Sequence, residues 1–157
     1  MIQVCIENRP SLVFISSKGL LMRPLKIFIS SSIELNDERK AVVELIERLA
    51  PKVKRNKIDL QAVMWEKLPA YSTAISNQAV YERKLAQCEI FICMIHRKVG
   101  RYTKKELDIA IKNCQTSRNP RKILFLFKII RSEEMSADTL SVIRLMEQLK
   151  KQERFPV

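Results

Sequence analysis

The fold is decided by the stretch Glu89-Ile-Phe-Ile-Cys-Met-Ile-His96, Arg97-Lys-Val-Gly-Arg-Tyr102 and Thr103-Lys-Lys-Glu-Leu-Asp-Ile-Ala-Ile111. Its first part is a short apolar run bounded by charged residues, which predicts a strand buried on both faces, as in a parallel sheet. Its last part has apolar residues at helical spacing, which predicts a helix with Glu106 in its first turn. Because ligands bind at the carboxyl edge of open α/β sheets, Glu106 is the first candidate for a functional residue.

Strands and helices are predicted to alternate on both sides of this stretch. The expected strands are residues 25–30, 58–64, 89–96 and 122–128, and the expected helices begin near 31, 73, 103 and 137. Such alternation predicts an α/β fold with a central parallel sheet between layers of helices. We therefore expect a flavodoxin-like three-layer sandwich with strand order 2-1-3-4. That order places residues 30–32 beside residues 96–106.

The two ends of the chain fit this scheme less well. Residues 1–24 contain short strand-like runs, and we treat them as an N-terminal extension that either adds an edge strand or is disordered. Residues 25–157 are then the α/β domain. The fifth strand of a flavodoxin-like sheet is missing or incomplete, so we expect a further domain or a partner chain. The apolar runs are far shorter than the roughly 20 residues of a membrane-spanning helix.

The net charge of +12 suggests an anionic partner, either a phosphorylated small molecule or a nucleic acid, although a solvated basic surface explains it equally well. The basic residues gather in residues 52–57, 97–105 and 118–122. Tyr102 is the one aromatic among them, whereas a single-strand binding face interleaves several, so we do not expect a nucleic-acid partner. The sequence has two glycines, which excludes glycine-rich phosphate-binding loops.

The cysteines and the single histidine limit the chemistry that the chain can carry out. The four cysteines have no zinc-site spacing, and Cys93 falls within a predicted strand. Reduced thiols in a cytoplasmic protein are the simpler interpretation. With one histidine, His96, neither a Ser-His-Asp triad nor a histidine-rich metal site is expected. His96 is a candidate base, but a histidine at a strand end more often has a structural role.

An ordered set of segments resembles a bacterial Toll/interleukin-1 receptor (TIR) domain, as found at the N-terminus of multidomain bacterial signalling and defence proteins. The resemblance covers roughly residues 25–130. It rests on Lys26-Ile-Phe-Ile-Ser-Ser-Ser32, on Leu85-Ala-Gln-Cys-Glu-Ile-Phe-Ile-Cys93 and on Tyr102-Thr-Lys-Lys-Glu-Leu-Asp-Ile-Ala110. The last segment is similar to the Trp-x-x-x-Glu-Leu segment of that family. Trp65, with Leu68-Pro69, stands where those domains carry their BB loop.

The resemblance implies an activity and a set of site residues. Catalytic TIR domains cleave NAD to nicotinamide and an ADP-ribose product through a glutamate, and Glu106 occupies the matching position. It implies NAD as a substrate, no separate cofactor or metal, and self-association through TIR–TIR contacts. The residues expected to bind the substrate are Phe28, Ser30, Ser31, Trp65, Arg97, Arg101 and Tyr102.

Some features depart from the family pattern and keep alternatives open. Tyr102 replaces the usual tryptophan, and the BB-loop Arg-Asp and Pro-Gly pairs are absent. A non-catalytic TIR-like assembly module is therefore the second hypothesis. Thr103-x-x-Glu106-x-x-x-Ala110 also resembles a segment of nucleoside 2-deoxyribosyltransferases, which implies related chemistry at a ribosyl carbon. Glutamate in the first turn of a helix is also favoured by the helix dipole, whatever its function.

Overall fold

The computed structural model describes residues 2–7, 22–64 and 77–153 of the chain. A five-stranded sheet in the order β1-β5-β4-β2-β3 forms its centre. The strands are β1 (Ile2–Glu7), β2 (Arg23–Ser31), β3 (Ile58–Val63), β4 (Ile90–Ile95) and β5 (Lys122–Phe127). The helices are α1 (Asn36–Lys54), α2 (Asn77–Ala86), α3 (Arg101–Thr116) and α4 (Ala137–Glu153), with short 3-10 turns at Ile33–Leu35 and Ser132–Glu134.

The four strands from β2 to β5 are parallel and lie in the order β3-β2-β4-β5. When these four strands are numbered from β2 along the chain, this is the predicted order 2-1-3-4. The outer position next to β5 is taken by β1, which runs antiparallel with Ile2 opposite Phe127. The N-terminal extension thus supplies an edge strand, which was one of the two structures predicted for it. A strand from the start of the chain can take this position because an antiparallel neighbour needs no helical crossover.

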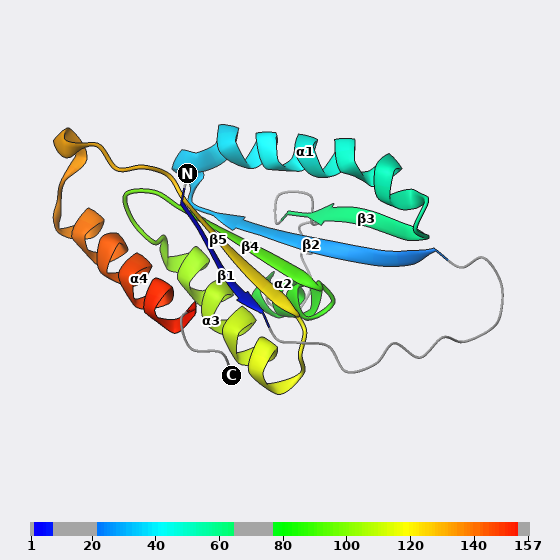
Figure 1. Cartoon of the computed structure of the whole chain (residues 1–157). Coiled ribbons are helices and arrows are strands. Elements are labelled where there is room, and N and C mark those ends of the chain that lie inside the picture. The colour runs from blue at the N-terminus through cyan, green and yellow to red at the C-terminus, as the bar shows by residue number, and fades with distance from the viewer. Residues whose placement is uncertain (1, 8–21, 65–76, 154–157) are drawn as a thin grey trace.

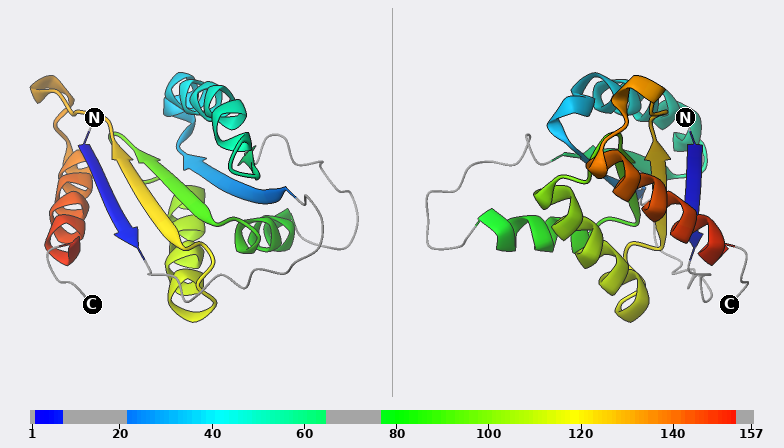
Figure 2. Two further views of the ribbon diagram at one scale, coloured as in Figure 1. Left: turned by 45° about the vertical axis from the view of Figure 1, so that its right-hand side comes forward. Right: turned by 90° about the vertical axis from the view of Figure 1, so that its left-hand side faces the viewer.

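Helices cover both faces of the sheet, in three layers (Figures 1 and 2). α1 covers one face, where its Val43 and Ile46 pack on Ile27, Ile29 and other side chains of β2 and β4. α2, α3 and α4 cover the other face and form the larger core cluster with Phe28, Phe91, Phe125 and their neighbours. Both faces of β4 are therefore covered, which explains its continuous apolar sequence. β5 is buried on one face and half-buried on the other.

The start of α1 differs from the sequence-based expectation. Ser31 ends β2, and a 3-10 turn at Ile33–Leu35 precedes the helix, which begins at Asn36 and not near residue 31. The helix continues through Pro51 and ends at Lys54. Leu49 is 38% exposed because the buried stripe of the helix runs through Arg39, Val43 and Ile46.

The start of α3 also differs from the prediction. Gly100 is the N-cap, and the backbone N–H of Lys104 donates to the Gly100 carbonyl at 2.8 Å, which closes the first turn. Because the helix begins at Arg101, Glu106 is in its second turn and not in the first. The helix dipole acts mainly within the first turn. The dipole therefore explains the glutamate at this position less well than the sequence suggested.

Candidate active site

Glu106 lies at the carboxyl edge of the sheet, above the ends of β2 and β4. The hydroxyl of Ser30, next to last in β2, donates to Oε2 of Glu106 at 2.5 Å. Ser30 is fully buried and Glu106 is partly exposed. β2 and β4 are the strands on either side of the point where the strand order reverses. The Ser30–Glu106 pair thus occupies the position where sheets of this class bind ligands.

The strand pairing determines which side chains lie next to Ser30 and Glu106. Cys93 of β4 is the register partner of Ser30 in β2, and its side chain is fully buried. Burial raises the pKa of the Cys93 thiol, and the nearby negative charge of Glu106 raises it further. Phe28 is completely buried on the same face, stacked on Phe91 with ring centroids 5.7 Å apart. The Ser30 hydroxyl therefore donates to a carboxylate that lies on the sheet face where the larger apolar core is packed.

Ser31 points to the opposite face of the sheet, because successive side chains of a strand alternate. Its Oγ accepts a hydrogen bond of 3.0 Å from Nη1 of Arg39, which is 4% exposed. Nη2 of Arg39 donates to Oδ1 of Asn36 at 3.2 Å. The two predicted serines therefore have different surroundings, and Ser30 is the one beside Glu106.

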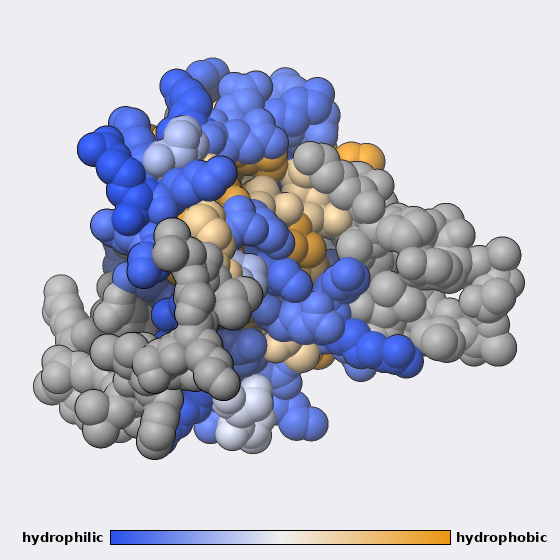
Figure 3. Space-filling view, turned by 90° about the vertical axis from the view of Figure 1, so that its right-hand side faces the viewer, coloured by the Kyte–Doolittle hydropathy of each residue, from blue (hydrophilic) through white to orange (hydrophobic). Residues whose placement is uncertain are grey.

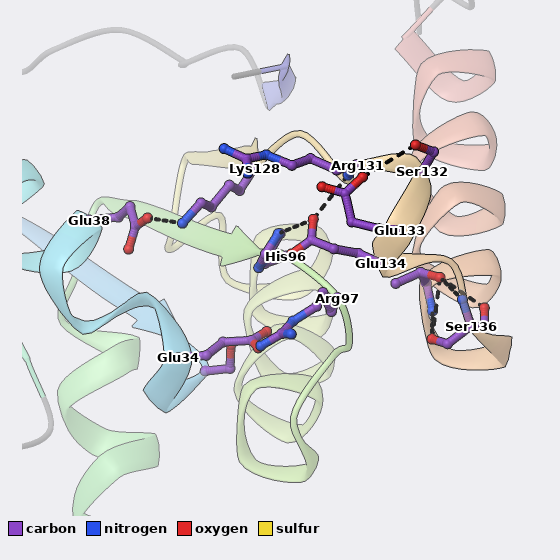
Figure 4. Close-up of polar contacts among 12 residues, drawn as sticks. Glu34, Glu38, His96, Arg97, Lys128, Arg131, Ser132, Glu133, Glu134 and Ser136 are labelled. Atoms are coloured by element: carbon purple, nitrogen blue, oxygen red, sulfur yellow. Dashed lines mark hydrogen bonds and ion pairs between the residues drawn. The ribbon is translucent and has the colours of Figure 1, made fainter.

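The loop after β4 is joined to the turn after β2, as the strand order predicts. Nε and Nη2 of Arg97 donate to Oε2 of Glu34 at 3.2 and 3.0 Å (Figure 4). A Cβ atom added to Gly100 would lie 3.9 Å from Cβ of Ser32, so the loop and the turn are in close contact. Both side chains of the ion pair are partly solvated, which limits its contribution to stability to about 1 kcal/mol or less.

The remaining predicted site residues differ in exposure. Tyr102 is 74% exposed and precedes Glu106 by four positions, so the two share a face of α3. Arg101 is exposed at the start of the helix. Phe28 has no exposed surface, and Trp65 lies outside the described residues. Among the residues predicted to bind the substrate, Ser30 is hydrogen-bonded to Glu106 and Arg97 forms an ion pair with Glu34.

A second polar group lies at the same edge, and of its members the sequence analysis considered only His96. Lys128, after β5, pairs with Glu38 of α1, and Nε2 of His96 lies 3.5 Å from Oε2 of Glu134 (Figure 4). His96 is 6% exposed, and its Nε2 makes no hydrogen bond to the described residues. The backbone N–H of Arg131 lowers the pKa of Glu134, with His96 and Arg97 as smaller causes. His96 thus packs against the β5–α4 connection, in agreement with a structural role.

The polar residues of the described segments do not suggest a metal site. They contain no group of three or more histidine, cysteine, aspartate or glutamate side chains able to hold a metal ion. Nor does any helix among them have the length and apolar character needed to cross a membrane.

The sequence profile of a family described as "Domain of unknown function (DUF4062)" matches residues 26–155. The chain belongs to this family. The match begins in β2 and extends through α4, so the DUF4062 domain contains both Ser30 and Glu106, whereas β1 precedes it. Among curated proteins, none matches the chain. The DUF4062 description carries no activity, and the site itself is the basis for a functional proposal.

Proposed function

We propose that the chain is a TIR-like enzyme that cleaves the N-glycosidic bond of NAD, with Glu106 as the catalytic residue. The observation that carries the proposal is the hydrogen bond between Ser30 and Glu106 at the switch point of the sheet. The resemblance to TIR domains implies the same glutamate. By this proposal the domain acts in bacterial immune or stress signalling.

The proposed reaction needs one carboxylate and no metal. The bond between C1′ of the ribose and the nicotinamide nitrogen breaks, and its electron pair neutralises the positively charged ring. Nicotinamide therefore leaves without a general acid. The sugar carbon becomes oxocarbenium-like, and the carboxylate of Glu106 stabilises it or traps it covalently, as in glycosidases. Water then adds to C1′ and loses a proton, which yields ADP-ribose.

The other site residues have defined roles in this proposal. Ser30 positions the Glu106 carboxylate through its hydroxyl, and Cys93 and Phe28 are buried on the same sheet face. Tyr102 offers an exposed ring on the same helix face, which suits stacking against a flat base. Arg101, exposed at the start of α3, attracts the pyrophosphate.

Nicotinamide release from NAD by the purified chain tests the proposal, at high protein concentration and with the chain crowded on a bead surface. Glu106→Gln should abolish release, while its thermal melt stays nearly unchanged because the amide oxygen still accepts from Ser30. Asp108→Asn is the matched control, an exposed carboxylate on the same helix. Equal release by Glu106→Gln and the parent chain would refute the assignment.

One observation favours the second candidate function, an assembly module without catalysis. Ile33 and Tyr102 are 84% and 74% exposed, and they follow the carboxyl ends of β2 and β4. Exposed apolar side chains around one edge are typical of protein contacts. Concentration-dependent self-association without nicotinamide release would favour this function. Transfer of the sugar to an added free base, in place of water, would indicate the deoxyribosyltransferase-like alternative.

A further inference from the structure

Two of the three basic clusters of the sequence lie on the same side of the sheet, where the parallel strands begin. Residues 52–57 end α1 and lead into β3, and residues 118–122 lead from α3 into β5. Both connections lie at the amino ends of parallel strands, opposite the candidate active site. The third cluster, residues 97–105, follows the carboxyl end of β4. The fold therefore divides the positive charge between two edges with different surroundings.

Hydrogen bonds connect the two clusters through the start of β2. The backbone N–H of Arg23 donates to the carbonyl of Lys57 at 2.8 Å, and its guanidinium pairs with Glu89 at 2.8 Å. The backbone N–H of Arg121 donates to the carbonyl of Glu89, also at 2.8 Å. We name this surface the basic edge, and its exposed cationic side chains are Arg23, Lys52, Lys54, Arg55, Lys57, Lys84, Arg118 and Arg121.

The backbone at this edge gives a second, independent observation. Lys57 has a φ of 59° and Arg118 a φ of 56°, and they are the two non-glycine residues with positive φ among the described ones. This left-handed conformation favours glycine, because a Cβ atom comes too close to the next carbonyl oxygen. The chain therefore places a basic residue in each of these turns, although a glycine would adopt the same backbone conformation without the steric strain. Such strain points to a use for the side chain itself.

Although the sequence alone predicted no nucleic-acid partner, we propose that the basic edge binds the phosphate backbone of a nucleic-acid duplex. The connection before β3 and the connection before β5 are three strand spacings apart, roughly 14 Å. A duplex groove is of similar width, about 12 Å for the major groove of B-DNA. Cations from the two connections can thus reach phosphates of both strands. Contacts of this kind bind without reading the sequence.

The composition of the edge favours a duplex over other anionic surfaces. Single-strand binding relies on aromatic side chains for stacking, and the two described connections, residues 52–57 and 118–122, contain none. Membrane-surface binding adds apolar side chains that enter the lipid. The most exposed apolar side chains described, Ile33 and Tyr102, lie at the opposite edge. Figure 3 views the molecule from the side on which α1 ends, and hydrophilic residues cover most of the coloured surface around a narrower hydrophobic strip.

The test is the binding of short DNA and RNA duplexes of arbitrary sequence, measured by fluorescence anisotropy across a salt series. The informative variant is Lys57→Gly with Arg118→Gly, because glycine suits both turns. We expect its melting temperature to be unchanged or higher, while duplex affinity falls. The slope of log K against log salt should become shallower by roughly 0.9 for each lost phosphate contact.

The matched control removes two lysines from the other ends of the same helices, by Lys40→Gln with Lys104→Gln. It loses the same net charge and should bind duplex more tightly than the glycine variant does. Equal weakening by the two variants would overturn the proposal, since net charge alone would then explain binding. Absence of duplex binding at low salt would also overturn it, as would capture by anionic phospholipid vesicles in place of duplex. None of these outcomes depends on NAD cleavage.

Discussion

Ser30 donates a hydrogen bond of 2.5 Å to Oε2 of Glu106, across 76 positions of sequence and from a fully buried position. The bond holds one carboxylate oxygen of Glu106, a partly exposed residue, against the end of β2. A hydrogen bond to a charged group is worth about 1.5–3 kcal/mol. Ser30 therefore orients one oxygen of the Glu106 carboxylate.

The first prediction concerns this bond. Ser30→Ala should lower nicotinamide release about 10-fold or more, because the carboxylate loses the donor that orients it. Steady-state kinetics with a parallel thermal melt is the measurement, and the loss should be in kcat with the fold retained. Ser117→Ala, at the other end of α3, serves as the control. Undiminished kcat in Ser30→Ala would show that the bond has no positioning role.

The second prediction separates a buried aromatic from an exposed one. Phe28 is completely buried against Phe91, so Phe28→Ala should lower the free energy of unfolding by about 3–5 kcal/mol. Tyr102 is 74% exposed, and Tyr102→Ala should change the free energy of unfolding by less than about 0.5 kcal/mol. Urea denaturation of both variants gives the comparison. Similar losses in the two variants would contradict the packing described for Phe28.

The third prediction concerns the thiols. Burial raises the pKa of Cys88 to about 12, with nearby Lys26 and Lys84 acting weakly against it. Burial likewise raises the pKa of Cys93 and of Cys114. The thiolate is the reactive form, so these three should resist alkylation in the native state near neutral pH. Mass spectrometry after a pulse of iodoacetamide should find them modified only after unfolding, and native labelling of Cys93 would contradict its burial.

The fourth prediction concerns pH. The hydrogen bond from Lys128 is the main cause that lowers the pKa of Glu38 below its ordinary value. A lowered folded-state pKa means that the stabilisation is fully present above the unfolded value and is lost as pH falls through the folded value. The pair is partly exposed, so its contribution is about 1 kcal/mol or less.

The parent chain should therefore be slightly more stable than Lys128→Gln at pH 6–7, a range above the usual glutamate pKa of about 4.3. The difference should shrink as pH falls below that value. Urea midpoints across a pH series measure it, with Lys40→Gln as a control for loss of one positive charge. A stability difference that grows on acidification would contradict this linkage.

The fifth prediction concerns Gly100, the N-cap of α3. Its φ of −60° is open to any residue, and an added Cβ would lie 3.6 Å from Oγ1 of Thr103, an ordinary contact. Gly100→Ala should therefore leave the melting temperature within a few degrees of the parent, since no strain or clash is introduced. A large drop in melting temperature would show that the loop adopts another conformation.

The sequence predicted most of the fold because its strongest patterns are local. The apolar run before His96 and the alternation of strands with helices gave the parallel sheet, its order and the edge that holds Glu106. Helix boundaries were less accurate. The start of α3 depends on a single backbone bond to Gly100, and α1 passes through Pro51, and neither follows from hydrophobic spacing.

The candidate site was only partly predictable. The family resemblance implied both Ser30 and Glu106, and the strand order placed them at one edge. The sequence could not separate Ser30 from Ser31, since the direction of a side chain depends on which face of the strand each helix covers. Cys93 lies near the site because it is the register partner of Ser30, and the sequence analysis did not predict this register.

What the sequence determined by itself is the fold class and the edge at which its candidate residues gather, because hydrophobic periodicity fixes which elements form and the short connections fix their order. What the tertiary structure decided is which distant residues meet. It joined Ser30 to Glu106, placed β1 beside β5, and brought two basic clusters to the edge opposite the candidate site. These contacts depend on strand register and helix packing, which bring together residues that lie far apart in the sequence.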